Sequence, residues 1–300
     1  MPRVLVTHAT EYRYARPVRL TPHRLMLRPR DSHDLRLLDA TLYVTPGDPV
    51  TRWAHDVFSN SICILEWRGG ATETLRIVSE LELAHYPGAA SLSNETLDPA
   101  AETYPFSYAS DEFPDLARTL ERHHPDPERR IDAWARRFLR PGGHTPTMAL
   151  LAGITEAIKT DFRYEAREAE GTNPPLQTLA TRSGACRDLS LLMMEAVRAL
   201  GFAARFVSGY LYDAALADSD TQVIGGGTTH AWVAVYLPGA GWVEFDPTNG
   251  LIAGRNLIRV SVARTPDQAI PVAGGFIGRA SDFIGLTVDV QVRVGDAPPK

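Results

Sequence analysis

The stretch Ser183-Gly184-Ala185-Cys186-Arg187-Asp188 places a cysteine directly before an apolar segment that runs from Leu189 to Leu200. Apolar residues recur in that segment at helical spacing, and Gly201 follows it as a C-terminal stop signal. The pattern predicts a helix with one buried face, and it puts Cys186 at the helix start or within one residue of it. Unpaired N–H groups and the positive end of the helix dipole favour the thiolate form of a cysteine there. A single cysteine is more often a small buried side chain than a nucleophile, so its interpretation depends on residues further along the chain.

A β-hairpin is predicted downstream of this helix. His230 to Tyr236 reads as one strand, Leu237 to Gly241 as the turn and Trp242 to Asp246 as the returning strand. A three-residue loop places Asp246 directly opposite His230, and a five-residue loop, which pairs Tyr236 with Trp242, places it diagonal to His230. In both registers the two side chains share one face and lie within reach of each other. A four-residue loop would put them on opposite faces.

A thiol at a helix start, a histidine at a strand start and an acid near that histidine form a nucleophile, a base and an orienting group. In such a set the thiolate attacks a carbonyl carbon, and the imidazole holds the thiol proton and later gives it to the leaving amine. The carboxylate fixes the imidazole tautomer and stabilises the imidazolium. Cys186, His230 and Asp246 therefore predict amide-bond chemistry that passes through a thioester.

The composition of the whole chain is that of an ordinary globular protein. Of its 300 residues, 44% are hydrophobic and 22% are charged, so a disordered chain is not expected. The formal net charge of −5 gives no electrostatic reason to expect nucleic acid as a partner. No apolar run reaches transmembrane length, the N-terminus shows no export signal, and the two cysteines, Cys63 and Cys186, make a poor disulfide framework. We therefore expect a cytoplasmic protein with no membrane partner and reduced thiols.

The chain is expected to divide into three parts. Residues 1–90 read as short strands separated by Pro-Gly and polar breaks, which predicts an antiparallel β-sandwich. Residues 91–112 include a polar stretch without periodicity and read as a linker. Residues 113–300 are assigned to a core that carries the cysteine helix on an antiparallel sheet and ends in a closing strand, 286–294. The polar loop 213–228 is expected to be functional or mobile because of its length.

Three further helices are predicted before the cysteine helix, near residues 114–123, 127–138 and 147–159. Arginine is frequent in the first forty residues, which is typical of the solvated face of strands and less often of a patch for acidic ligands. No cluster of cysteine, histidine and acidic residues has the spacing of a zinc site, so neither a metal nor another cofactor is expected.

Four blocks of the sequence, in their order, resemble the core of the transglutaminase-like superfamily, and more narrowly its bacterial cysteine-peptidase-like branch. The stretch His8 to Arg30, together with Asp56 to Asn60, resembles the β-rich N-terminal region that accompanies this core in bacteria. The four blocks are Gly184-Ala185-Cys186-Arg187-Asp188, Arg205-Phe206-Val207-Ser208-Gly209-Tyr210, His230-Ala231-Trp232-Val233-Ala234-Val235-Tyr236 and Gly241-Trp242-Val243-Glu244-Phe245-Asp246-Pro247-Thr248.

The resemblance implies an α+β core of papain-like arrangement, with Cys186 as nucleophile, His230 as general base and acid, and Asp246 as orienting carboxylate. One oxyanion donor would be the backbone N–H of Cys186. Tyr164 is the candidate side-chain donor, with a buried structural tyrosine as the alternative. Asp188 matches an acid often found in this branch and also suits a helix start. Trp232 either lines the substrate cleft or belongs to the core.

The expected function is cysteine-dependent acyl transfer, most simply the hydrolysis of a peptide or isopeptide bond in a peptide or protein substrate. Protein-glutamine transamidation shares the first half-reaction and is the alternative from the same site, since only the attacking group differs. A non-catalytic binding or scaffold protein that retains the fold is the alternative from another class. Such relatives usually lose a member of the triad, and this chain has all three residues.

Overall fold

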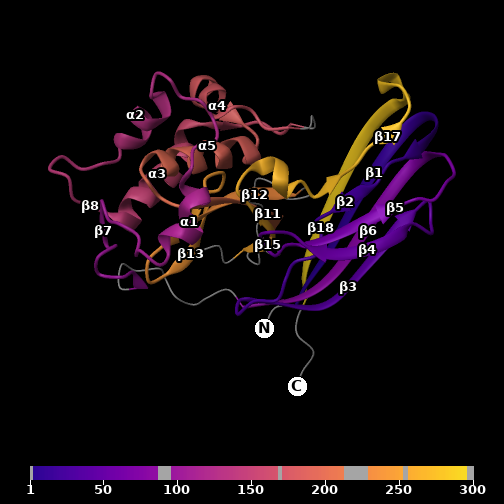
Figure 1. The fold of residues 1–300 in the computed structure, drawn as a ribbon, viewed down its shortest axis with the longest axis horizontal. Coiled ribbons are helices and arrows are strands. Elements are labelled where there is room, and N and C mark those ends of the chain that lie inside the picture. The colour runs from indigo at the N-terminus through magenta and orange to yellow at the C-terminus, as the bar shows by residue number, and fades with distance from the viewer. Residues whose placement is uncertain (1–2, 87–95, 168–170, 213–228, 253–255, 296–300) are drawn as a thin grey trace.

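The computed structural model describes residues 3–86, 96–167, 171–212, 229–252 and 256–295 (Figure 1). The molecule is elongated. Helices gather around one sheet at one end, and long strands of the N-terminal region form the other end. The combination of helices with antiparallel sheets that the sequence predicts is confirmed. Among the described residues, no helix is both long and apolar enough to cross a membrane.

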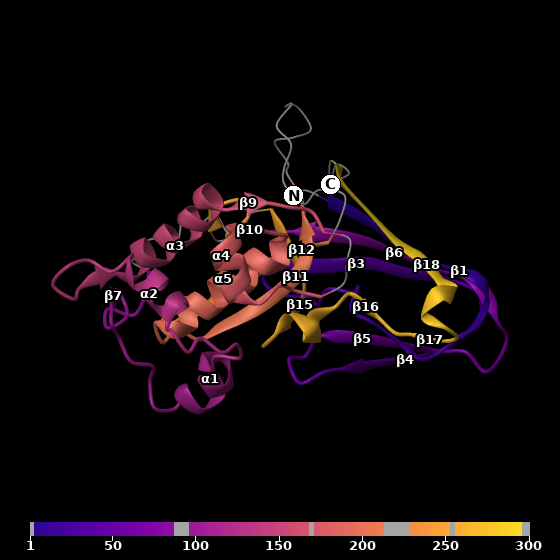
Figure 2. The ribbon, with the colours of Figure 1, turned by 90° about the horizontal axis from the view of Figure 1, so that it is seen from above.

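The N-terminal region is built from two antiparallel sheets that face each other (Figure 2). One sheet has the order β17-β1-β6-β3, with β18 also paired to β1, and the other has the order β16-β2-β5-β4. Tyr14 and Ile77 of the first sheet and Leu25 and Leu65 of the second belong to one buried apolar cluster, which holds the sheets together. The strands are β1 (Arg3–Leu20), β2 (His23–Leu25), β3 (Leu35–Thr45), β4 (Val50–His55), β5 (Ser61–Glu66), β6 (Thr72–His85), β16 (Val272–Ala273), β17 (Phe276–Ile277) and β18 (Phe283–Gly295).

The last strand belongs to the N-terminal sheet. Strand β18 runs antiparallel to β1, from Arg3 opposite Gly295 to Tyr14 opposite Phe283. The alternation in residues 286–294 predicts a strand, which is observed, but its expected place in the 113–300 core is corrected by this pairing. The physical reason is that alternation indicates a half-buried strand and carries no information about which of two sheets the strand joins.

The core consists of helix α5 packed on a five-stranded antiparallel sheet with the order β14-β13-β12-β11-β15. Apolar side chains of α5, such as Leu192 and Val197, share one buried cluster with Val233 and Phe245 of the sheet. This cluster explains the helical apolar pattern after Cys186. The elements are α5 (Cys186–Ala199), β11 (Ala204–Leu211), β12 (His230–Leu237), β13 (Gly241–Asp246), β14 (Leu251–Ile252) and β15 (Leu257–Ala263).

Four further helices surround α5 among the described residues, and three of them correspond to the helices predicted before it. They are α1 (Phe113–Leu120), α2 (Arg130–Arg136), α3 (Thr147–Asp161) and α4 (Pro175–Thr181). Short strand pairs and 3-10 turns complete the fold: β7 (Thr103–Tyr104), β8 (Thr145–Pro146), β9 (Arg163–Tyr164), β10 (Ser183–Gly184), η2 (Pro266–Ala269) and η3 (Ala280–Asp282). Of the predicted linker, residues 91–95 lie outside the described residues, as does the loop 213–228. The described part packs firmly, since Leu97 is buried and the Tyr104 hydroxyl donates to the Leu200 carbonyl at 3.0 Å.

A buried contact joins the N-terminal region to the core sheet. Two histidines of the N-terminal region face two tyrosines of the core, with His8 Nδ1 3.0 Å from the Tyr210 hydroxyl and His85 Nδ1 2.6 Å from the Tyr212 hydroxyl. Asn60, in the turn before β5, exchanges two hydrogen bonds with the backbone of Val262 on the edge strand β15, at 2.7 and 2.9 Å. The two regions are therefore fixed to each other by directional bonds as well as by apolar packing.

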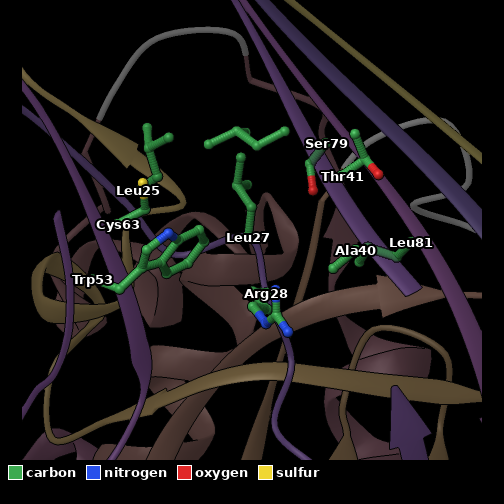
Figure 3. A pocket seen from close by; sticks show the side chains of 10 residues that line it. Leu25, Leu27, Arg28, Ala40, Thr41, Trp53, Cys63, Ser79 and Leu81 are labelled. Atoms are coloured by element: carbon green, nitrogen blue, oxygen red, sulfur yellow. The ribbon is translucent and has the colours of Figure 1, made fainter. Parts of the chain in front are cut away.

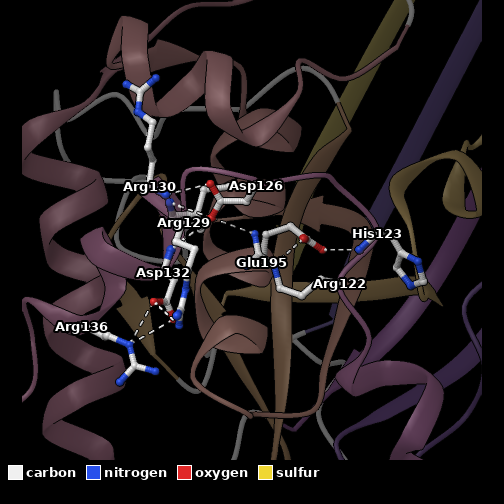
Figure 4. Close-up of polar contacts among 9 residues, drawn as sticks. Arg122, His123, Asp126, Arg129, Arg130, Asp132, Arg136 and Glu195 are labelled. Atoms are coloured by element: carbon white, nitrogen blue, oxygen red, sulfur yellow. Dashed lines mark hydrogen bonds and ion pairs between the residues drawn. The ribbon is translucent and has the colours of Figure 1, made fainter.

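A buried ion cluster anchors the C-terminal half of α5 (Figure 4). The Glu195 carboxylate accepts hydrogen bonds from Arg122 Nε at 3.0 Å, Arg198 Nη1 at 3.2 Å and the His123 backbone N–H at 3.3 Å. The side chains of Glu195 and Arg198 are both fully buried. Arg198 also donates to the carbonyl oxygens of Thr119 and Ala204. One carboxylate on α5 thus balances the cations that tie this helix to the segment after α1 and to the sheet.

We predict that His8 makes the stability of the protein depend on pH. Burial lowers the pKa of His8 to about 4, against an opposing effect of Asp289, while the same group in the unfolded chain titrates near 6.5. The unfolded state therefore binds the proton first, so this stabilisation is complete above pH 6.5 and is lost as the pH falls towards 4. Between pH 7.5 and 5.0, wild type should lose about 2 kcal/mol more unfolding free energy than His8→Gln in urea titrations. Equal losses in the two proteins would contradict the prediction.

A second prediction concerns Glu195. Replacing it with glutamine in Glu195→Gln leaves Arg198 buried without a counter-charge, and the unfolding free energy should fall by about 3 kcal/mol in urea titrations. The matched control is Glu165→Gln, which breaks the exposed ion pair between Arg163 and Glu165 on the surface. That change should cost less than about 1 kcal/mol. Similar losses in the two variants would show that the buried cluster has no special weight.

Candidate active site

The start of α5 is fixed by the carboxylate of Asp188. This side chain is fully buried, and it accepts hydrogen bonds from the backbone N–H of Ala185 at 2.9 Å, from the N–H of Asn173 at 2.7 Å and from Arg167 at 2.8 Å. A Cβ at Gly184 would lie 2.8 Å from Asp188 Cβ, so only glycine fits there. Asp188 thus acts as the helix-start acid, and with its carboxylate fully buried it has no surface to offer a substrate.

Cys186 is the first residue of the helix and is only half-buried. Beside it, His230 and Asp246 are buried, with His230 Nε2 2.8 Å from Asp246 Oδ2. Among the described residues, His230 Nδ1 has no hydrogen-bond partner with good geometry, while Cys186 lies close enough to influence the charge state of the ring. Because Asp246 holds Nε2–H, Nδ1 is the nitrogen that is left to exchange a proton with the thiol.

The hairpin that brings His230 and Asp246 together has one of the registers that the sequence allows. Tyr236 pairs with Trp242 and Val233 with Phe245, which is the register predicted for a five-residue loop. Asp246 therefore lies diagonal to His230 on the same face of the sheet. The four-residue loop that would have separated the two side chains is not observed.

The electrostatics of the pair favour two opposite charges. Burial alone would lower the pKa of His230, but Asp246 and the neighbouring Cys186 outweigh it, and the pKa of His230 is raised. Burial would raise the pKa of Asp246, but His230, Asn249 and the Thr248 N–H outweigh it, and that pKa is lowered. The site therefore stabilises an imidazolium next to a carboxylate.

Trp232 supports the imidazole and does not line an open cleft. Its side chain is fully buried, and its ring stacks on His230 with centroids 5.9 Å apart and an interplanar angle of 29°. The outer end of the indole packs against Gly209, where a Cβ would lie 2.7 Å from the ring and 2.0 Å from the Ile258 carbonyl oxygen. Of the two alternatives for Trp232, a cleft residue or a core residue, the buried ring agrees with the core residue.

Tyr164 lies at the helix start. It is half-buried on β9, which pairs in parallel with β10 so that Tyr164 is opposite Gly184. Burial raises the pKa of the Tyr164 phenol, and the influence of Cys186 raises it further. The structure thus brings Cys186, His230, Asp246 and Tyr164 together. Asp188 holds the start of α5, and the Trp232 ring stacks on the imidazole.

Sequence reasoning did not identify Asn249 as a site residue. Its Nδ2 donates to Asp246 Oδ2 at 2.8 Å and lies 3.5 Å from His230 Nε2. The signal in the sequence was an amide side chain three residues after a buried acid, in the turn that ends the hairpin.

A hollow between the two sheets of the N-terminal region lies apart from this site (Figure 3). It measures about 310 Å³ when the space up to bulk solvent is included, and Leu27, Arg28, Trp53 and Cys63 are among its lining residues. None of its lining residues belongs to the Cys186 site. Cys63 is buried there, and burial raises the pKa of its thiol to about 11. Within the described residues, no three His, Cys, Asp or Glu side chains are grouped as metal ligands.

Fold and site together define a class of protein in which a cysteine at a helix start faces a buried histidine–aspartate pair on an antiparallel sheet. Two family models match the chain: the transglutaminase-like superfamily over residues 132–247 and the bacterial transglutaminase-like N-terminal region over residues 4–84. Residues 132–247 therefore carry the core of the transglutaminase-like superfamily, and residues 4–84 carry the bacterial transglutaminase-like N-terminal region. The resemblance of the four sequence blocks is confirmed.

The chain is also similar to individual proteins. An uncharacterized protein of Mycobacterium tuberculosis is 28% identical over 305 residues, which cover 98% of this chain and 94% of that protein. A protein-glutamine gamma-glutamyltransferase of Pseudomonas aeruginosa is 31% identical over 110 residues, which cover 35% of this chain and 16% of that protein. The crystal structure of a candidate cysteine protease from Cytophaga hutchinsonii has the same fold, with a TM-score of 0.71, 18% identity and coverage of 100% of this chain and 92% of that one.

We predict that Gly209→Ala disturbs the site through Trp232. The added methyl group has to displace either the Ile258 carbonyl or the indole, and the indole is what supports the His230 ring. The unfolding free energy should fall by about 1–3 kcal/mol in urea titrations, and the NMR signals of the His230 ring should shift. The control is Gly285→Ala, where an added Cβ meets no atom within 4 Å. Unchanged His230 signals in a folded Gly209→Ala protein would contradict this view.

Proposed function

We propose that the protein is a thiol acyl-transfer enzyme that hydrolyses peptide or isopeptide bonds, with Cys186 as nucleophile, His230 as general acid and base, and Asp246 as orienting carboxylate. The observation that carries the proposal is the buried pair of His230 and Asp246, held through Nε2 at 2.8 Å, with Nδ1 left for the half-buried Cys186 thiol. This is the arrangement that nucleophilic catalysis by cysteine requires.

In the first half-reaction, Cys186 Sγ attacks the carbonyl carbon of the substrate and its proton passes to His230 Nδ1. The carbon–nitrogen bond then breaks, the amine leaves with the proton from Nδ1, and a thioester on Cys186 remains. In the second half-reaction, water attacks the thioester, and His230 takes one proton from the water and returns it to the departing thiolate. The products are an amine and a carboxylic acid, and Cys186 is restored.

Two groups near Cys186 can stabilise the negative oxygen that forms in both half-reactions. The backbone N–H of Cys186 is at the first position of α5, where backbone donors have no partner within the helix. The Tyr164 hydroxyl is the second group, and its proximity to Cys186 supports this role. The raised pKa of Tyr164 keeps the hydroxyl protonated, so that it can donate a hydrogen bond.

Transamidation is the second candidate function. It is favoured by the likeness to the Pseudomonas aeruginosa protein-glutamine gamma-glutamyltransferase, although that likeness covers 35% of this chain. Both reactions share the thioester, so the choice depends on whether water or an amine reaches the acyl group first. Hydrolysis needs only water, which the half-buried position of Cys186 allows to approach.

An acyl-enzyme assay tests both parts of the proposal. With p-nitrophenyl acetate as acyl donor, intact-mass spectrometry should find one acetyl group, on Cys186 and not on Cys63, and the group should disappear through hydrolysis. His230→Ala should acetylate about 10²–10⁴-fold more slowly because the base is lost. Cys63→Ala is the matched thiol control and should behave as wild type.

Adding cadaverine to the same assay separates the candidate functions. A hydrolase should still release acetate as its main product, whereas a transamidase should release N-acetylcadaverine. If Cys186 is acetylated no faster than Cys63 in the native protein, the site is not activated, and a binding or scaffold role replaces both enzymatic candidates.

A further inference from the structure

We propose that Asn249 is a positioning residue, whose side-chain amide holds the Asp246 carboxylate in one orientation and in its ionised form. The inference rests on the proposed function, because it concerns the group that orients His230. It adds a fourth side chain to the three that carry the reaction, and this side chain acts through Asp246 without contact with the substrate.

Hydrogen bonds to both carboxylate oxygens hold Asp246 in place. Oδ1 accepts from the backbone N–H groups of Thr248 at 3.0 Å and Asn249 at 3.3 Å, and Oδ2 accepts from His230 at 2.8 Å and from Asn249 Nδ2 at 2.8 Å. A carboxylate offers about four acceptor positions, so these bonds fill them. Asp246 is fully buried, and water cannot take the place of a lost donor without entering the core.

The backbone and the side chain of Asn249 bond to different oxygens of Asp246. The bonds to Oδ1 come from main-chain groups and persist whatever side chain stands at position 249. Oδ2 accepts one bond from His230 and one from the Asn249 amide. Removing the amide therefore leaves this oxygen with the bond from His230. The amide nitrogen must face Asp246, because an amide oxygen at 2.8 Å from a carboxylate would be repelled.

The Asn249 amide does not compete with Asp246 for the imidazole. Asn249 Nδ2 lies 3.5 Å from His230 Nε2, and both atoms donate to Oδ2. Two donors cannot bond to each other, so the amide leaves the proton of Nε2 to the carboxylate. His230 therefore keeps the tautomer in which Nδ1 is free to exchange a proton with Cys186.

The turn that carries Asn249 is held against α3. Gly250 has a φ of +69°, and a Cβ there would lie 2.6 Å from Lys159 Cδ and 3.0 Å from Glu156 Oε2. The turn is thus pressed against α3, and glycine is the residue that allows this approach. Asn249 is held on one side by its bonds to Asp246 of the sheet and on the other by Gly250, which packs against α3. The position of the amide is therefore fixed.

The consequence is a specific dependence on pH. The titratable groups that surround Asp246 are His230 on β12 and, through it, Cys186 on α5, while Glu156 and Lys159 of α3 lie against the Gly250 backbone. The hydrogen bond from Asn249 helps to lower the pKa of Asp246. Losing it raises that pKa, so the carboxylate is neutralised at a higher pH, and the effect is confined to the acidic side.

The experiment compares wild type with Asn249→Ala, Asn249→Asp and the control Gln291→Ala. The control removes an amide that also donates to an aspartate, Asp289 at 3.1 Å, but on the exposed surface of β18. The readout is the NMR signal of His230 Nε2–H, followed from pH 8 downwards until the signal is lost. Parallel samples report the rate at which iodoacetamide alkylates Cys186.

In Asn249→Ala, the pH at which the Nε2–H signal is lost should rise by about one unit. Asn249→Asp keeps the size of the side chain and places a second carboxylate against Asp246, so its shift should be larger still. Alkylation of Cys186 in Asn249→Ala should be about tenfold slower than in wild type at the acidic end and nearly equal at pH 8. Gln291→Ala should match wild type throughout.

An unchanged loss of the Nε2–H signal in both Asn249 variants would overturn the inference. A decrease in alkylation that is equal at every pH would also overturn it, because that result describes general damage to the fold. The NMR comparison does not require Cys186 to be reactive, so it decides the role of Asn249 even if the proposed function fails. That failure would be recognised separately, as a wild-type Cys186 that reacts no faster than Cys63.

Discussion

The buried hydrogen bond between His230 and Asp246 is the interaction on which the rest of the site depends. It forms because neighbouring strands β12 and β13 put the two residues diagonally on one face of the sheet, where neither is exposed. A buried carboxylate needs a cation or several donors, and Asp246 has both. Helix α5 packs across the other face of the same sheet and places Cys186 near the end of β12 at which His230 lies.

The N-terminal region takes part in this support. One of its contacts with the core sheet lies at the end of β11, where Tyr210 meets His8, and the preceding residue, Gly209, is the one on which Trp232 packs. Trp232 in turn stacks on His230. A continuous path of contacts therefore leads from the first strand of the chain to the imidazole. Strand β18 pairs with β1 in the same sheet.

Residue patterns predict the parts of the structure that depend on local order. The apolar spacing after Cys186 predicts α5, and the alternation around Leu237 to Gly241 restricts the hairpin to registers that bring His230 and Asp246 together. What they could not predict is partner choice over long distances. Strand β18 alternates equally well in either sheet, Trp232 is equally hydrophobic in a cleft or in a core, and the bond from Asn249 to Asp246 depends on how the turn folds back against α3.

The most direct measurement of the central claim is the pH dependence of Cys186 alkylation by iodoacetamide, read by mass spectrometry in wild type and in His230→Ala. An ordinary thiol, with a pKa of about 8.5, loses reactivity steadily below that pH. If Asp246 and His230 support a thiolate, wild-type Cys186 should stay reactive well below pH 8.5, and His230→Ala should move the profile up to that of an ordinary thiol. Identical profiles in the two proteins, both falling like a free thiol, would contradict the assignment of Cys186 as an activated nucleophile.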